Sequence, residues 1–223
     1  MYAFLAGVVP SLIWLFFWTR EDRDQPEPKM LLAGLFLSGM IMVIVAIPVE
    51  QYIAGLTTTA FSQYTFWAAV EEILKFSAVA LVALRTRAYD EPIDAMIYCI
   101  TVALGFAALE NTLFIMGPLT HGELAASIVT GNMRFIGATL VHIVSSGLIG
   151  FGLGEAFYRG AFAKAMACAL GLAAAITVHA SFNLSIVSST PADALKTFGW
   201  IWGGVVVMIL LFEEIKAVRP VLA

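Results

Sequence analysis

The sequence contains little charge and little cysteine. Only 13% of its 223 residues are charged, whereas about 25% is usual for a soluble domain. The balance of 12 basic against 16 acidic residues excludes a basic surface for nucleic acid, so no nucleic-acid partner is expected. The two cysteines, Cys99 and Cys168, lie in apolar runs and form no CxxC pair, which argues against a disulfide scaffold or a zinc knuckle.

Apolar residues are abundant instead. They make up 61% of the chain, and the mean hydropathy is +0.91. A soluble protein of this size could not bury so much apolar surface, so we expect the excess to face lipid. A membrane-spanning helix needs about 20 mostly apolar residues. Seven segments are candidates: 2–19, 30–49, 65–84, 93–117, 134–158, 162–188 and 198–212.

These segments predict an all-α, polytopic membrane bundle of about seven transmembrane helices, forming one integral-membrane domain over residues 1–223. The first run has no basic segment before it and no Ala-x-Ala cleavage site, which favours a retained span over a cleaved signal peptide. The predicted location is the plasma or inner membrane, crossed several times, with the lipid bilayer as an immediate partner.

Lysine and arginine positions predict the orientation, because short cytoplasmic loops are enriched in these residues. With the N-terminus outside, only Arg134 and Lys196 fall on the outer side, and Lys75 lies within a span. The remaining basic residues fall on the cytoplasmic side: Arg20, Arg23, Lys29, Arg85, Arg87, Arg159, Lys164, Lys216 and Arg219. We therefore expect the N-terminus outside and the C-terminus inside.

Several ionisable residues are expected inside the membrane. A charge at mid-bilayer costs about 2.5–3.5 kcal/mol on insertion scales, so such residues usually face the bundle interior or water. With a rise of 1.5 Å per residue, the acids and histidines fall in one layer, roughly 9–14 Å below the outer boundary. The set is Glu71, Glu72, Lys75, Glu110, His142 and His179. Their shared depth predicts a common site that opens toward the outer side.

Helical spacing places some of these side chains together. Glu71 and Lys75 are i,i+4 neighbours that share a face, whereas Glu72 points about 100° away. His179 and Asn183 likewise share a face. In such a set a glutamate can take a proton from water, while His and Asn side chains hold the charge that develops on the attacked carbonyl.

The same residue types also bind metals. His142, His179 and Glu110 could hold Zn²⁺ and leave a fourth position for water. Against a metal, the chain lacks an HExxH helix, and Asn183 beside His179 suits an oxyanion better. The residues therefore leave two mechanisms open, one without a cofactor and one with Zn²⁺. They slightly favour the metal-independent mechanism.

Two other interpretations account for polar residues in a membrane. A proton- or ion-coupled transporter or channel also keeps glutamates and histidines there, although it often shows an internal repeat or broken helices, and no repeat is found here. Interhelical contacts are the other interpretation, each worth about 0.6–2 kcal/mol. They explain a lone Asn or His better than the pair Glu71 and Glu72, because a second buried acid is costly to insert.

The polar residues form four short motifs on successive spans. The motifs are EExxK (Glu71, Glu72, Lys75), GFAALEN (residues 105–111), a single histidine (His142) and HxxxN (His179, Asn183). In this order they resemble the PrsW family of intramembrane proteases, which lies within the CAAX-protease-and-bacteriocin-processing superfamily. The resemblance covers residues 65–190.

This resemblance implies an intramembrane endopeptidase that cuts membrane-anchored protein substrates near the outer face, as in site-one cleavage of an anti-sigma factor. It implies that Glu71 or Glu72 is the general base and that Asn183 helps to stabilise the oxyanion. The implied site is completed by Glu110, His142 and His179, with Lys75, Asn111 and Arg134 in supporting roles.

The chain departs from the prenyl-protein branch of the superfamily at two positions. That branch has an arginine one residue beyond Lys75 and a histidine at the place of Glu110. These differences argue against a CAAX-processing role. The resemblance is compatible with both a metal-dependent and a glutamate-dependent mechanism.

Overall fold

The computed structural model describes residues 1–20, 25–187 and 191–220. Within these residues the chain forms α-helices and one π-helical turn, and no strand. The elements are α1 (Tyr2–Thr19), α2 (Lys29–Leu56), α3 (Ala60–Val82), α4 (Asp94–Thr120), α5 (Leu124–Met133), η1 (Arg134–Ala138), α6 (Thr139–Glu155), α7 (Ala161–Val187) and α8 (Pro191–Lys216). The predicted all-α class is confirmed.

Six of the described helical segments are long and apolar enough to cross a membrane. They are α1, α2, α4, the continuous segment α5–η1–α6, α7 and α8. The helix α3 was also expected to span, but Glu71, Glu72 and Lys75 make it less apolar than the other six. Seven spans therefore stay a prediction.

Several helices extend beyond the expected spans. The helix α2 continues to Leu56 instead of ending at residue 49, and α8 begins at Pro191 instead of residue 198. An apolar run ends at the lipid boundary, whereas helical hydrogen bonding continues into more polar sequence. Two predicted features, the end of a span at residue 188 and the basic residue Arg23, lie outside the described residues.

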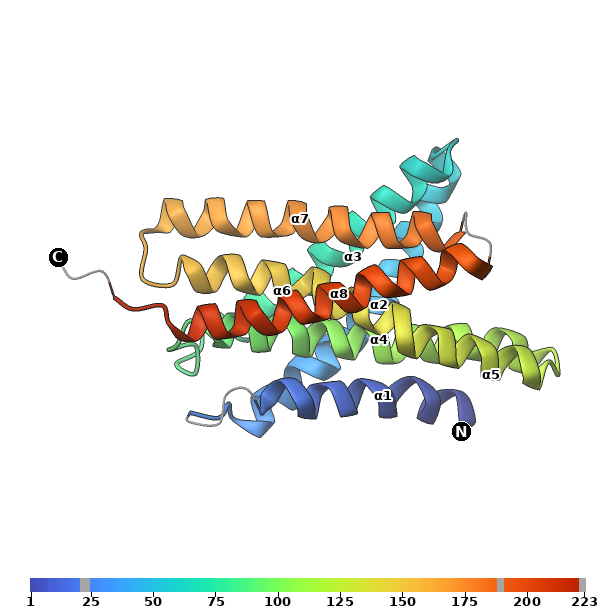
Figure 1. Ribbon diagram of the computed structural model, residues 1–223, viewed down its shortest axis with the longest axis horizontal. Coiled ribbons are helices and arrows are strands. Elements are labelled where there is room, and N and C mark those ends of the chain that lie inside the picture. Colours follow the sequence, from blue (N-terminus) through green and yellow to red (C-terminus); the bar gives the residue numbers. More distant parts are fainter. Residues whose placement is uncertain (21–24, 188–190, 221–223) are drawn as a thin grey trace.

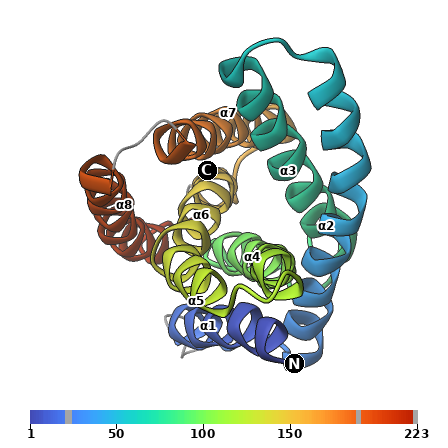
Figure 2. The same cartoon turned by 90° about the vertical axis from the view of Figure 1, so that its right-hand side faces the viewer.

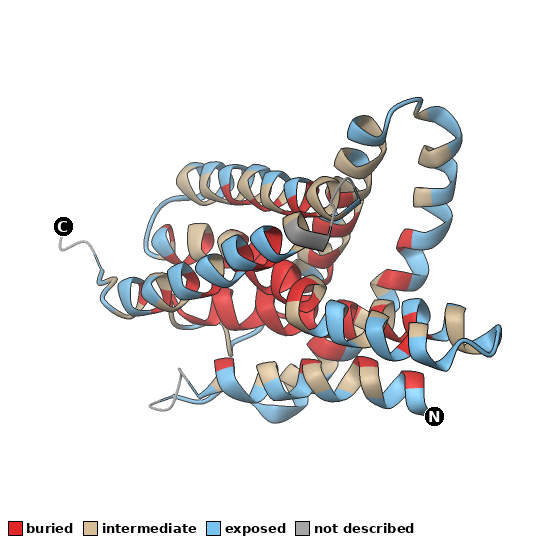
Figure 3. Cartoon of the chain, turned by 45° about the vertical axis from the view of Figure 1, so that its right-hand side comes forward, coloured by how far each residue is buried: buried red, intermediate tan, exposed pale blue. Residues whose placement is uncertain are grey.

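The helices α4 and α6 form the centre of the bundle (Figure 2). Every residue from Asp94 to Ala108 in α4 and from Thr139 to Gly147 in α6 is buried (Figure 3). The helices α1, α2, α3, α7 and α8 surround this centre and carry exposed apolar side chains such as Phe16, Ile44 and Leu170. These outer faces are suited to lipid, so the core of the molecule is the pair α4 and α6.

Glycines allow the helices to approach the core closely. A Cβ atom on Gly150 of α6 would lie 2.5 Å from the Cα of Met96 in α4. A Cβ on Gly39 of α2 would lie 2.1 Å from the carbonyl oxygen of Val102. A larger side chain at either position would separate the helices that hold the polar residues together.

The two ends of the bundle differ in their content of basic residues. The C-terminal ends of α1, α3, α6 and α8 lie at one end, whereas the N-terminus and the α2–α3 and α4–α5 connections lie at the other (Figure 1). The α3–α4 and α6–α7 connections and the first turns of α2 and α7, which lie at the first end, contain Lys29, Arg85, Arg87, Arg159 and Lys164. This grouping follows the alternation assumed in the orientation argument, and the side on which each end lies stays a prediction.

Candidate active site

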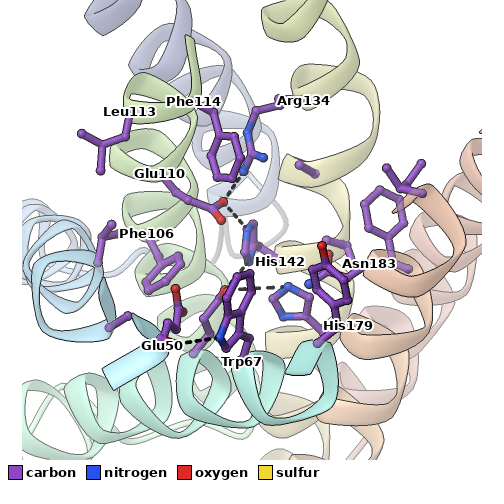
Figure 4. Close-up of a pocket in the computed structure, with 18 of the residues that line it drawn as sticks. Glu50, Trp67, Phe106, Glu110, Leu113, Phe114, Arg134, His142, His179 and Asn183 are labelled. Atoms are coloured by element: carbon purple, nitrogen blue, oxygen red, sulfur yellow. Dashed lines mark hydrogen bonds and ion pairs between the residues drawn. The ribbon is translucent and has the colours of Figure 1, made fainter. Parts of the chain in front are cut away.

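The polar residues predicted from the sequence meet at the centre of the bundle. Glu71, Glu72 and Lys75 come from α3, and Glu110 comes from α4. His142 of α6 and His179 of α7 complete the cluster (Figure 4). The cluster borders a cavity of about 880 Å³. Residues far apart in the sequence thus meet, and Glu71, Glu110, His142 and His179 line the cavity.

Glu72 is a buried carboxylate whose oxygens are both occupied. Its Oε1 accepts hydrogen bonds from Lys75 Nζ at 2.6 Å and from His179 Nδ1 at 2.8 Å. Two serines of α6 also donate to it, Ser145 at 3.0 Å and Ser146 at 2.8 Å. These bonds connect α3 to α6 and α7, so Glu72 holds three helices together and has no oxygen left for a substrate.

Lys75 is buried among three partners. Its Nζ donates to Glu72, lies 2.9 Å from His142 Nδ1, and lies 3.8 Å from Glu71 Oε2. The sequence predicted a pair with Glu71, whereas the hydrogen bond is made to Glu72. On a helix, residues three apart are neighbours, and so are residues four apart. The flexible side chain of Lys75 can therefore reach both Glu72 and Glu71.

The hydrogen-bond partners determine the tautomers of the two histidines. An ammonium group only donates, so His142 Nδ1 accepts from Lys75 and Nε2–H donates to Glu110 at 3.0 Å. His179 Nδ1 donates to the carboxylate of Glu72, which leaves a lone pair on its Nε2. That lone pair lies 3.7 Å from Glu71 Oε2. His142 is therefore neutral, and we assign the same neutral form to His179, whose Nε2 faces Glu71.

Glu71 differs from its neighbour because it lines the cavity and keeps a free acceptor. Its Oε2 is buried and has no hydrogen-bond partner among the described residues. It faces His179 Nε2, which is also an acceptor. Two acceptors at this distance are satisfied by one water molecule that donates to both, or by a cation that both coordinate. This pair is the point at which the site can hold a nucleophilic water.

Glu110 forms an ion pair with Arg134 at the cavity wall. Arg134 Nη2 donates to Glu110 Oε2, and its Nε donates to Asn111 Oδ1 at 2.5 Å. Asn111 Nδ2 donates in turn to Thr139 Oγ1 at 2.9 Å, and the guanidinium lies 3.9 Å from the ring centre of Phe114. The structure thus places Asn111 and Arg134, two of the three supporting residues expected from the sequence, in contact with the site.

The π-helical turn η1 orients Arg134. In a regular α-helix Arg134 and His142 would point about 80° apart, since each residue turns by about 100°. A π turn is wider and turns less per residue, which reduces this angle. Both side chains consequently contact Glu110. No sequence pattern predicted this π-helical turn.

Metal-ligand atoms also converge here. Glu71, His142 and His179 offer one atom each, and these atoms lie within 4.8 Å of one another. The predicted set contained Glu110, but its Oε2 is already engaged by Arg134 and His142, so Glu71 stands in its place. The unpartnered oxygen of Glu71 and the carboxylate behind His179 fit a divalent ion. A metal bound through His142 Nδ1 has to displace the ammonium of Lys75.

Other lining residues extend the site. Asn183 follows His179 by one helical turn and lines the cavity (Figure 4). Sequence reasoning missed Ser145 and Ser146, although they follow His142 by three and four residues, which is the spacing of a shared face. It also missed Glu50, because α2 was expected to end just before it.

Known proteins resemble this chain over most of its length. A family model described as PrsW family intramembrane metalloprotease matches residues 27–213. A relative named Protease PrsW from Geobacillus kaustophilus (strain HTA426) is 28% identical over 68% of this chain and 65% of its own length. One of the same name from Bacillus subtilis (strain 168) is 25% identical over 84% of both chains. A third, from Clostridioides difficile (strain 630), is 27% identical over 56% of this chain and 55% of its own length. No solved structure matches.

Proposed function

Because the chain belongs to the PrsW family of intramembrane metalloproteases, we propose that it hydrolyses peptide bonds of membrane-anchored protein substrates. It is an integral membrane protein with several helices able to cross the bilayer. The observation that carries the proposal is the pair of facing acceptors, Glu71 Oε2 and His179 Nε2, 3.7 Å apart beside the cavity. A water held between them directs its protons to the protein and an oxygen lone pair to the cavity.

In this proposal Glu71 is the general base. As the water oxygen attacks the carbonyl carbon of the peptide bond, a water proton passes to Glu71 Oε2. The amide of Asn183 donates to the oxyanion that forms. When the carbon–nitrogen bond breaks, Glu71 gives the proton to the leaving amine. The carboxylate is then restored and both products carry complete termini.

The remaining polar residues hold this pair in position. Glu72 accepts from His179 Nδ1 and so keeps the Nε2 lone pair directed at the water. Lys75 supplies the positive charge that balances the adjacent acids. Glu110 and Arg134 fix the ring of His142, which packs edge-on against His179 with ring centroids 4.9 Å apart.

A metal ion of the kind named in the family description would be held by Glu71, His142 and His179. Such an ion supplies Lewis-acid activation of a water molecule or a carbonyl group. Glu71 is the buried carboxylate here with an unpartnered oxygen, so its use as a ligand competes with its use as a base. We propose the use as a base, because the ammonium of Lys75 already lies among the ligand atoms.

We infer that the substrate reaches the site from the outer side. The cavity is lined by the C-terminal parts of α2, α4 and α7 and by the N-terminal part of α3. These parts point toward the end of the bundle that holds the N-terminus, which is the outer end in the predicted orientation (Figure 1). The family resemblance adds the substrate class, a membrane-anchored protein such as an anti-sigma factor.

The test is hydrolysis of single-span proteins reconstituted with the purified chain in liposomes, with products identified by mass spectrometry. We expect Glu71→Gln to lower kcat by about 10²- to 10⁴-fold, as loss of a general base does. The matched control is Glu123→Gln, since Glu123 is an exposed acid in the α4–α5 connection. Full activity of Glu71→Gln contradicts its role as base, and absence of cleavage by the unmodified chain contradicts the protease proposal.

A further inference from the structure

The cavity wall contains a carboxylate that the proposed reaction does not use. Glu50 of α2 lines the cavity on the side away from Asn183 (Figure 4). Its backbone carbonyl accepts a hydrogen bond from Trp67 Nε1 at 3.0 Å. Its carboxylate has no hydrogen bond or ion pair with any residue that the structure describes. A partly buried acid without a counter-charge is suited to bind a ligand that carries a positive charge.

The other acids of the cavity already have cations beside them. Glu110 pairs with Arg134, and Glu71 lies 3.8 Å from Lys75. Both histidines of the lining are neutral in the tautomers given above. Lys75 is shared between Glu71 and Glu72, so Glu50 is the acid of the lining that has no ion-pair partner among the described residues.

Aromatic side chains line the cavity together with Glu50. Trp67 and Phe106 lie beside Glu50 (Figure 4), and Tyr64 packs edge-on against Trp67 with ring centroids 5.4 Å apart. The negative faces of aromatic rings attract cations. Phe106 already contacts one, because Lys75 Nζ lies 4.8 Å from its ring centre. A carboxylate and aromatic rings in one cavity wall match the ammonium or guanidinium group of a basic side chain, together with its apolar stem.

We propose that Glu50, Trp67 and Phe106 form a substrate subsite for a lysine or arginine side chain near the scissile bond. The subsite opens into the same cavity as Glu71, so a chain that presents its carbonyl to Glu71 can place a nearby side chain against Glu50. An acidic side chain at this position is repelled by Glu50 and Glu71. The inference rests on the proposed function in naming the ligand a substrate, whereas the recognition is a binding property that can be measured without catalysis.

The experiment measures peptide binding to the Glu71→Gln chain in detergent, so that no peptide is consumed. Three short apolar peptides differ only in a central Lys, Gln or Glu, and fluorescence anisotropy reports their affinities. We expect the Lys peptide to bind about tenfold more tightly than the Glu peptide, as for a close charge pair. Adding Glu50→Gln removes most of this difference, adding Glu50→Asp keeps it, and adding Glu50→Lys reverses it.

The control is Glu123→Gln in the same background, which keeps the preference because Glu123 is exposed and outside the cavity lining. Equal affinity for the three peptides, undetectable binding, or a Lys preference that survives Glu50→Gln overturns the subsite. Hydrolysis is measured separately with the unmodified chain. A Lys preference in binding without any hydrolysis supports the subsite and contradicts the protease function.

Discussion

Glu71 and Glu72 are adjacent in sequence but have different surroundings. Glu72 accepts hydrogen bonds from Lys75, Ser145, Ser146 and His179. Glu72→Gln leaves the ammonium of Lys75 buried without its closest counter-charge, and breaking a buried ion pair in this way costs about 3–5 kcal/mol. We expect a clearly lower midpoint of thermal unfolding in detergent, with some hydrolysis by the fraction that stays folded.

The matched variant is Glu71→Gln. In the unmodified chain Glu71 Oε2 makes no hydrogen bond with any described residue, so the midpoint of unfolding should change little while hydrolysis is lost. The same thermal scan and the same liposome assay compare both proteins. A stable but inactive Glu72→Gln chain beside an active Glu71→Gln chain would exchange the two roles.

Metal dependence is also decided at individual side chains. We expect the purified active chain to keep hydrolysing after treatment with a strong chelator, because Glu71 and His179 can hold water directly and Lys75 supplies a cation beside them. Elemental analysis of the same sample measures bound zinc. Stoichiometric zinc, with activity lost on chelation and restored by added zinc, contradicts this expectation.

In that case the metal content of variants locates the ligands. Glu71→Gln and His179→Ala would lower the bound zinc, since both residues belong to the group of converging ligand atoms. Glu110→Gln would keep it, because the oxygen that faces the site is already paired with Arg134 and His142. Loss of zinc in Glu110→Gln alone would restore the ligand set expected from the sequence.

At the scale of the helix, α2 carries two kinds of glycine. A Cβ on Gly39 would meet the carbonyl oxygen of Val102 at 2.1 Å, whereas a Cβ on Gly34 would meet nothing within 4 Å. Overpacking a tight contact costs about 1–3 kcal/mol. We therefore expect Gly39→Ala to lower the midpoint of thermal unfolding in detergent.

Gly34→Ala is the control on the same helix. Alanine favours a helix over glycine by roughly 0.5–1 kcal/mol, so this variant should be unchanged or slightly more stable. Equal effects of the two substitutions would show that α2 and α4 do not pack closely in the membrane. A shift confined to Gly39→Ala supports the contact that places Glu50 at the cavity.

At the scale of the whole molecule, the distribution of basic residues predicts which end faces outward. Single cysteines in a chain carrying Cys168→Ser test this in intact cells, because Cys99 is buried. Glu123→Cys should react with an impermeant thiol reagent, and Arg159→Cys should react only after the membrane is opened. The reverse labelling pattern would show that the bundle has the opposite orientation and that the cavity opens toward the cytoplasmic side.

The class of the protein and most residues of the candidate site follow from the amino-acid sequence alone. Apolar runs of helical length must satisfy their backbone groups internally in lipid, so an all-α bundle was predictable. A charge within such a run is costly and has to be compensated. This cost identified Glu71, Glu72, Lys75 and Glu110 as candidate site residues from the sequence. These conclusions depend on local composition and on helical spacing.

The different roles of these residues depend on contacts between helices, which the sequence did not predict. Glu72 is occupied because Ser145, Ser146 and His179 come from other helices, and Glu71 keeps a free oxygen for the same reason. The turn η1 aims Arg134 at Glu110, and the length of α2 brings Glu50 to the cavity. Helical spacing predicts which side chains share a face of one helix. The partners they meet depend on how helices cross, and that is set by packing between segments far apart in the chain.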